Sequence, residues 1–289
     1  MKNYKLAWRN LWRNRRRTFI TAASVFFAVF FALFMRSVQL GSYDYMYKNV
    51  IESYSGYIQV QQEEWWDEKT INNSFEYSEK INQWLLEDKN VEQTIPRIES
   101  FALASGGVST KGVMVMGIDP EKESLLSNIS DKVVKYQLSP DAIKKIKQDE
   151  SLPKKTKEVV SLFEGSCYNN EERFLLDLGL KPEESKKYMP KLSAYTKINH
   201  EQINPGEAGA WIGDKLASYL ELNPGDTIVL LGQGYHGTTA AGKYVIKGLV
   251  KLPTSEISGR IVYLPYDIAQ QLYNVGNNVT SLVLHLNDN

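Results

Sequence analysis

Cysteine and histidine are scarce in this sequence of 289 residues. Cys167 is the single cysteine, which excludes an internal disulfide framework and any CxxC metal or redox motif. The three histidines (His200, His236 and His285) do not have the spacing of helical zinc sites, and no HExxH motif occurs. A GxSxG nucleophile elbow is absent as well. We therefore expect no metal, no cofactor and no catalytic residues.

Acidic residues are missing from the first 37 positions. That segment holds eight Lys or Arg, whereas the rest of the chain holds 26 basic and 34 acidic residues. Such an asymmetry is expected when two parts of a chain face different compartments. The acidic remainder would also repel phosphates, which argues against a nucleic-acid partner.

One long apolar run stands out, and it carries no charge from Thr18 to Met35. Eighteen helical residues cover ~27 Å of a ~30 Å hydrocarbon core. Arg17 and Arg36 bracket the run, and seven of the eight basic residues precede it. The positive-inside rule then places the N-terminus in the cytoplasm and the bulk of the chain outside. We expect a transmembrane helix over residues 18–40.

Two export signals are alternatives to this anchor. A cleaved signal peptide usually has an apolar region of ~7–15 residues that is followed by a small-residue cleavage site. The apolar run of this sequence is longer than that, and no such cleavage site follows it. Arg16 and Arg17 before the apolar run resemble a twin-arginine signal, which the same missing cleavage site disfavours. A retained anchor is the favoured interpretation.

The segment before the apolar run predicts an amphipathic helix. Apolar and aromatic residues fall on one face, namely Tyr4, Ala7, Trp8, Leu11 and Trp12, and basic residues fall on another, namely Lys5, Arg9, Arg13 and Arg16. Tryptophan and arginine are typical of the headgroup region of a membrane. We expect residues 1–17 to form a cytoplasmic interfacial helix with Trp8, Trp12, Arg9, Arg13 and Arg16 at the membrane surface.

The remainder alternates predicted strands and helices, which is an α+β pattern. A stalk helix is expected to continue the span as far as Gly56, followed by a strand at 57–61 and a helix at 77–86. The remaining strands are expected at 98–104, 112–118, 211–212, 227–231, 243–250, 260–263 and 280–286, with helices at 214–220 and 266–273. Residues 119–199 read as a mainly helical insertion.

A phosphate-binding loop is a tempting motif at Gly237–Lys243, because the spacing GxxxxGK is satisfied. Position 244 is Tyr where a Ser or Thr would reach Mg²⁺, and the following YVIKGLV predicts a strand instead of the helix that would hold a phosphate. We interpret residues 232–243 as a flexible hairpin loop.

Several segments together resemble the FtsX-like, MacB-type permeases of ABC transporters, the group of macrolide exporters and lipoprotein-releasing complexes. They are AWRNLWRNRRRTF, SGYIQVQ, VMGIDPEKES, WIGDKLASYLELNPGDTIVLLG with YVIKGLVKL, and IVYLPYDIAQQLY with VTSLVLHL. These segments follow the order of the family over most of the chain. The insertion at 136–197 matches no family pattern, and the three C-terminal membrane helices of the family are missing, so we expect a permease fragment.

The resemblance implies a split porter-like subdomain, at 41–118 and 265–286, that carries an inserted subdomain at 119–264. It also implies cytoplasmic ATPase subunits, a second permease subunit, membrane lipids and a periplasmic lipoprotein carrier as partners, in the bacterial inner membrane. Lipoprotein release is favoured over drug efflux, since GYIQVQ and VMGIDPE resemble the releasing branch.

Three functions follow as hypotheses from the sequence. The first is a transport subunit in which Phe27, Phe30, Phe31, Phe34 and Met35 line a substrate cavity; the same side chains would equally suit lipid contact or helix packing. The second is a single-pass binding or sensor protein. The third is a secreted enzyme held by an uncleaved anchor.

Overall fold

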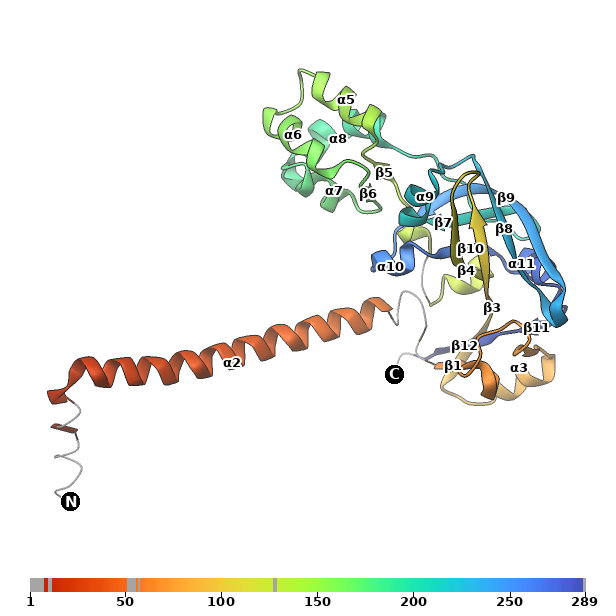
Figure 1. Cartoon of the computed structure of the whole chain (residues 1–289), viewed down its shortest axis with the longest axis horizontal. Coiled ribbons are helices and arrows are strands. Elements are labelled where there is room, and N and C mark those ends of the chain that lie inside the picture. The colour runs from red at the N-terminus through yellow and green to blue at the C-terminus, as the bar shows by residue number, and fades with distance from the viewer. Residues whose placement is uncertain (1–7, 10–11, 51–55, 57, 127–128, 288–289) are drawn as a thin grey trace. The chain divides into compact units, whose positions relative to one another are not determined.

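The computed structural model describes residues 8–9, 12–50, 56, 58–126 and 129–287. The chain divides into two compact units, residues 1–50 and 51–289, and each is described by itself. The first unit is dominated by one long helix, and the second holds all the strands (Figure 1).

Helix α2 (Arg15–Val50) contains the whole predicted span. Its residues 15–45 are long and apolar enough to cross a membrane, and their side chains are not buried within the chain. Regular backbone hydrogen bonding within the helix leaves no polar backbone group in need of water, which a membrane requires. The predicted stalk is helical as far as Val50, and its last residues, 51–55, lie outside the described residues. The predicted interfacial helix is likewise outside them at residues 1–7 and 10–11.

A small sheet opens the second unit. Strand β1 (Ile58–Val60) pairs with β12 (Ser281–Leu286), and β12 pairs with the first half of β3 (Val91–Ser105). Helix α3 (Glu79–Leu86) contacts β3, and Ser78 caps α3 by accepting a hydrogen bond from the Ile81 amide. A separate two-stranded antiparallel sheet of β2 (Phe75–Glu76) and β11 (Asn278–Val279) completes this region. The first and last strands of the unit therefore lie side by side.

Strand β3 changes partners halfway along its length. Residues 91–97 pair with β12, whereas Ile98–Ser105 pair with β4 (Thr110–Ile118), and Ala102–Ser105 also pair with β8 (Thr227–Gln233). Pro96 has no backbone N–H and lies where β12 is the registered neighbour. One continuous strand therefore belongs to two sheets.

Six strands close on themselves as a barrel in the order β3, β4, β10, β7, β9, β8 and back to β3. The remaining members are β7 (Gly209–Gly213), β9 (Thr239–Val250) and β10 (Ile261–Pro265). Alternate residues of each strand point inward and form the main core: Ala102, Ala104, Val113, Val115, Ala210, Ile212, Ile228, Leu230, Ala240, Tyr244, Ile246, Val262 and Leu264. Closure removes free strand edges, and small barrels of this kind are filled by side chains.

Helices extend this core. Helix α9 (Asp214–Leu220) follows β7, and α11 (Tyr266–Tyr273) follows β10, and both contribute buried residues to it. A separate cluster covers the outward face of β4, β10 and β7, where Met116, Tyr263 and Trp211 pack with Ile129, Ile203 and Leu252. The outward face of β3 and β8 has no such cover among the described residues, and Phe101, Leu103 and Leu231 are exposed there.

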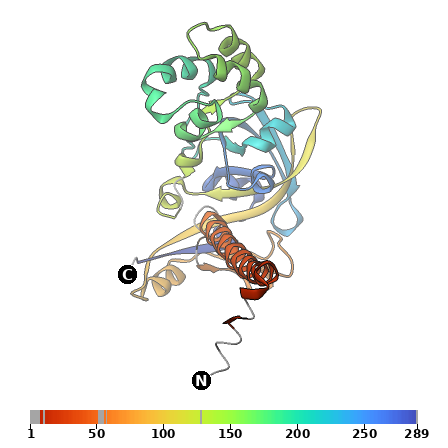
Figure 2. The same cartoon turned by 90° about the vertical axis from the view of Figure 1, so that its left-hand side faces the viewer.

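The helical insertion is residues 136–197. It contains β5 (Tyr136–Gln137), α5 (Pro140–Gln148), α6 (Lys154–Val159), β6 (Cys167–Tyr168), α7 (Glu171–Asp177) and α8 (Ser185–Thr196). These elements form their own core around Leu138, Ile146, Phe174 and Leu192, and in both views they gather at the end of the unit away from β12 (Figures 1 and 2). Short α4 (Pro120–Glu123) and α10 (Ser255–Ser258) lie outside the insertion.

The predicted hairpin loop at 232–243 needs correction. Strand β8 extends to Gln233 and β9 begins at Thr239, so the turn is confined to about five residues. Gly234 donates its amide to the Thr238 carbonyl at 2.7 Å, and His236 and Gly237 take left-handed backbone angles. Lys243 lies within a strand, so no helix follows the GxxxxGK spacing. The predicted subdomain boundaries at 118 and 265 stay a prediction, and β3 alone pairs in both the small sheet and the barrel.

Candidate functional site

The apolar helix α2 carries all five residues that the sequence analysis assigned to a substrate cavity. Phe27, Phe30, Phe31, Phe34 and Met35 are each about half exposed or more within the chain. Phe30 stacks on Phe34 with ring centroids 6.3 Å apart, and Phe27 stacks on Phe31 at 6.2 Å. The structure adds Phe26, which stacks on Phe30 at 6.1 Å and was missed although it lies four residues before it. We call the set Phe26, Phe27, Phe30, Phe31 and Phe34 the aromatic ladder.

Polar side chains within α2 are satisfied by the helix itself. The Thr21 hydroxyl donates to the Arg17 carbonyl at 3.0 Å, and the Ser24 hydroxyl donates to the Thr21 carbonyl at 2.8 Å. Such back-bonding lets hydroxyl residues lie in a membrane without an unpaired donor. Beyond Met35 the polar groups begin, as Arg36 donates to Gln39 at 3.2 Å. The boundary matches the predicted end of the apolar run.

The predicted membrane-surface residues lie before α2 and at its start. Trp8 and Trp12 have ring centroids 6.1 Å apart, and Arg15 lies over the Trp12 ring at 5.3 Å. Arg9, Arg13 and Arg16 are all exposed. Arg15, which the sequence analysis did not assign, is the arginine that contacts the tryptophan pair. The assignment of these residues to a membrane surface stays a prediction.

A buried ion pair marks the place where β3 changes partners, which we call the strand junction. Two N–H groups of Arg97 donate to the two carboxylate oxygens of Glu123, with Nε to Oε2 at 3.0 Å. The side chains are 1% and 5% exposed, so the pair is screened from water. Arg97 belongs to β3 and Glu123 to α4, and the pair therefore holds α4 on the end of the barrel. A spacing of 26 residues gave no sequence signal for it.

Further ionisable groups surround this pair. Burial raises the pKa of Glu99, although the charge of Arg97 partly offsets this. Burial lowers the pKa of Lys132 to about 8, against a smaller opposing effect of Glu123. Burial also lowers the pKa of Arg97, but the charge and hydrogen bonds of Glu123 outweigh it, so that the net pKa is raised. The strand junction is thus a compact charged cluster inside an apolar fold.

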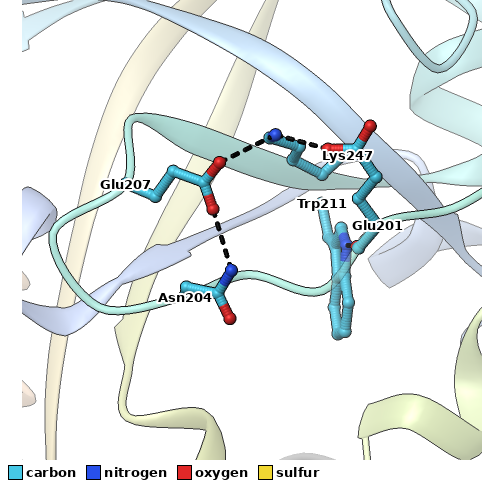
Figure 3. A network of polar contacts seen from close by, with 5 residues as sticks. All are labelled: Glu201, Asn204, Glu207, Trp211 and Lys247. Carbon is cyan, nitrogen blue, oxygen red and sulfur yellow. Dashed lines mark hydrogen bonds and ion pairs between the residues drawn. The ribbon is translucent and has the colours of Figure 1, made fainter.

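A second polar network fixes the segment that leads from the helical insertion back to β7 (Figure 3). Lys247 of β9 donates to Glu201 at 2.5 Å and to Glu207 at 3.0 Å, and Asn204 donates to Glu207 at 3.0 Å. The indole of Trp211 donates to the Glu201 carbonyl at 2.9 Å. Hydrogen bonds from Lys247 lower the pKa of Glu207, and the two carboxylates raise the pKa of Lys247. These side chains bond to one another and hold residues 201–207 against β9 and β7, so we interpret the network as structural.

Metal and nucleophilic chemistry find little support in the described residues. No group of three or more His, Cys, Asp or Glu side chains is placed there to hold a metal ion. Cys167 is buried, and burial raises the pKa of its thiol to about 12, which disfavours the reactive thiolate.

Comparison with known proteins gives similarity in structure alone. No protein-family model and no curated protein matches the sequence. The periplasmic region of MacB from Actinobacillus actinomycetemcomitans aligns with 80% of this chain and 74% of its own, at 9% identity and a TM-score of 0.37. The extracellular domain of the noncanonical ABC-type transporter YknZ from Gram-positive bacteria aligns with 74% of each chain, at 10% identity and a TM-score of 0.35.

The first neighbour is named as a region of MacB and the second as a domain of an ABC-type transporter, and MacB-type ABC transporters are the type that the sequence analysis named. At such identities and TM-scores the similarity assigns no substrate, partner or residue role to this chain. Those assignments are proposals from the chain's own residues.

The strand junction yields a stability prediction. Arg97→Met leaves the buried Glu123 carboxylate without its partner, and we expect the free energy of unfolding to fall by about 3–5 kcal/mol. The double variant Arg97→Met, Glu123→Met should recover most of the loss, because neither charge then remains buried. Urea unfolding of the full chain in detergent measures both. Lys144→Met, which breaks an exposed ion pair with Asp141, is the control and should change little. Equal losses for Arg97→Met and Lys144→Met would contradict this account.

Lys132 yields a pH prediction. Its pKa falls from 10.5 to about 8 on folding, so the unfolded chain holds a proton that the folded chain has lost between these values. The stability contribution is therefore present above pH 10.5 and is lost as the pH falls through 8. Relative to Lys132→Met, the native chain should gain up to about 3 kcal/mol between pH 8 and 10.5. Unfolding midpoints across this range test it, with the exposed Lys135→Met as control. Parallel curves for native and Lys132→Met protein would refute it.

Proposed function

We propose that this chain is the anchor and extracytoplasmic part of an ABC-transporter permease subunit. In this proposal, ATP hydrolysis by cytoplasmic ATPase subunits moves or releases a lipoprotein or another hydrophobic substrate outside the bacterial inner membrane. The chain would work by mechanical coupling with a second permease subunit, and a periplasmic carrier would receive a released lipoprotein. The observation that carries the proposal is the apolar, exposed α2 preceded by a cluster of arginines, joined to a separately folded unit.

The charge distribution supports an orientation with the N-terminus in the cytoplasm. Basic residues cluster before the apolar segment, and positive residues are retained on the cytoplasmic side of membranes. The Trp8 and Trp12 pair with Arg15 has the composition of an interfacial anchor. In this arrangement, residues after α2 form the extracytoplasmic domain.

The topology of the second unit supports a role in coupling. Strand β1 follows α2 in the chain, β12 pairs with β1, and β3 pairs with β12 before entering the barrel. A movement that reaches β1 would pass to β3 through two rows of backbone hydrogen bonds. The strand junction and the Lys247 network would keep the connected parts rigid. We retain 41–118 with 265–286 as a porter-like subdomain and 119–264 as its insertion within this proposal.

The aromatic ladder supports an apolar substrate. Stacked phenyl rings and Met35 give α2 a broad aromatic and thioether surface suited to acyl chains or other apolar groups. In the proposed assembly this surface would face the cavity between permease subunits.

A single-pass binding or sensor protein is the second candidate. It requires only the one helix able to span a membrane that the described residues contain, joined to the separately folded second unit. Both candidates share one topology and differ in their partners, since only the permease requires an ATPase.

The proposed orientation is testable with cysteine labelling. The native thiol, Cys167, is buried and provides an unlabelled background. Ser161→Cys introduces an exposed thiol in the extracytoplasmic unit, and Asn14→Cys introduces one before α2. A membrane-impermeant maleimide should label Ser161→Cys in intact spheroplasts and Asn14→Cys after lysis alone. The reverse pattern would overturn the topology.

The choice between the two candidates is made on membranes of the native source. Carbonate washing should leave the chain in the membrane fraction. After these membranes are crosslinked and solubilised, the chain should copurify with an ABC ATPase. Retention without an ATPase favours the binding or sensor protein and excludes the permease. Release by carbonate excludes both.

A crosslinking experiment tests the cavity. Benzoylphenylalanine at Phe30 or Phe34 should capture an acylated or apolar substrate on irradiation of active membranes. Val29 is the matched control, because it is similarly exposed and points away from Phe27, Phe31 and Phe34 at 100° per residue. Equal capture from all three positions would show that α2 contacts lipid on all sides, and it would contradict a substrate-binding face at the aromatic ladder.

A further inference from the structure

The outer surface of the barrel has a cleft that the proposed coupling does not use. It lies between the outward face of β3 and β4 and the segment of α10, and its volume is about 400 Å³. The lining, which we call the outer cleft, consists of Phe101, Ala102, Gly112, Val113, Met114, Glu256, Ile257 and Arg260. Small-molecule sites are typically apolar clefts of roughly 300–1,000 Å³ with few polar groups, and the outer cleft fits this description.

An apolar strip leads out of the cleft across three strands. Phe101 of β3 lies opposite Met114 of β4, and Leu103 lies opposite both Gly112 of β4 and Leu231 of β8. Opposite residues in an antiparallel pair share one face, so these side chains form a continuous row. Phe101, Leu103 and Leu231 are 53%, 45% and 47% exposed. The neighbouring outward face, at Met116 and Tyr263, is instead covered by other residues of the chain.

Two opposite charges flank the apolar lining. Glu256 belongs to α10, and Arg260 follows the helix four residues later. Both side chains are exposed, and within the described part of the chain neither forms an ion pair. A carboxylate and a guanidinium at the rim complement an ammonium and a phosphate respectively. A purely aliphatic ligand would form no ion pair with either Glu256 or Arg260.

We propose that the outer cleft binds a zwitterionic amphiphile. Its phosphate pairs with Arg260, its ammonium group pairs with Glu256, and its acyl chain lies over Met114 and Phe101 toward Leu103 and Leu231. The rim carries one positive and one negative group, and the floor is apolar. This combination favours a zwitterionic amphiphile over a second copy of the chain as the occupant. None of the cleft's lining residues belongs to the aromatic ladder, the strand junction or the Lys247 network, on which the proposed function rests.

Photolabelling of the full chain in amphipol tests the proposal. The probe is a lysophosphatidylcholine with a diazirine near the end of its acyl chain, used below its critical micelle concentration. Mass spectrometry should find the label on residues 101–114 or 229–233. An alkyl maltoside probe of the same chain length lacks the two charges and should label these segments at least about threefold less.

Gly112→Trp is the blocking variant. A Cβ atom at Gly112 meets no atom within 4 Å, so the indole can enter the cleft without displacing the backbone. Labelling should fall about tenfold, whereas Thr227→Trp, at an exposed position of β8 outside the lining, should leave it unchanged. Phe101→Ser removes part of the floor and is a second variant that should reduce labelling if Gly112→Trp does not fold.

Arg260→Gln and Glu256→Gln test the rim. Each should weaken capture of the zwitterionic probe about two- to fivefold and leave the maltoside probe unaffected. Absence of label from the cleft segments, labelling insensitive to both Gly112→Trp and Phe101→Ser, or equal labelling by the two probes would overturn the proposal. Dimerisation of the native chain that Gly112→Trp abolishes would also overturn it, in favour of a second copy.

Discussion

The second unit depends on one strand that must satisfy hydrogen bonds in two sheets. Closing a six-stranded barrel requires β3 to pair along both edges over Ala102–Ser105, with β4 on one side and β8 on the other. The same strand must still pair with β12 before Ile98. Backbone donors and acceptors that are buried without partners are costly, so neither set of pairings can slide without breaking the other. The position of β3 therefore fixes the small sheet and the barrel together.

The ion pair of Arg97 and Glu123 gains its importance from this constraint. Burying two charges costs several kcal/mol per ion before their attraction is counted, and such pairs seldom raise stability above that of an apolar replacement. The pair lies at the residue where β3 leaves β12 and enters the barrel. We interpret it as a device that selects one position of α4 against β3. An apolar pair would allow several positions at similar energy.

The sequence predicted the fold well wherever the signal was local. The apolar run of α2, the strand segments 227–231 and 243–250 and the helices at 214–220 and 266–273 follow from periodicity and turn residues. Residues 91–97 were missed as a strand because Pro96 and the polar Glu92, Gln93 and Thr94 hide the alternation. Barrel closure joins residues 102–105 to 229–232, and the cleft joins 101–114 to 256–260. Such pairings are set by tertiary structure, and one sequence contains no local pattern for them.

Two exposed apolar surfaces in this chain have different physical meanings. The aromatic ladder on α2 is exposed in a segment whose solvent would be lipid, where phenyl rings lose nothing by exposure and their presence alone identifies no ligand. Phe101, Leu103 and Leu231 belong to a barrel whose adjoining outward face, on β4, β10 and β7, is covered, and their own exposure to water is unfavourable by about 25 cal/mol per Å². A contiguous apolar row in water, beside two opposite charges that form no ion pair with the described residues, is the feature from which we infer a ligand. In the proposed function α2 anchors the chain in a membrane, and the specificity of the chain should be sought on the barrel surface.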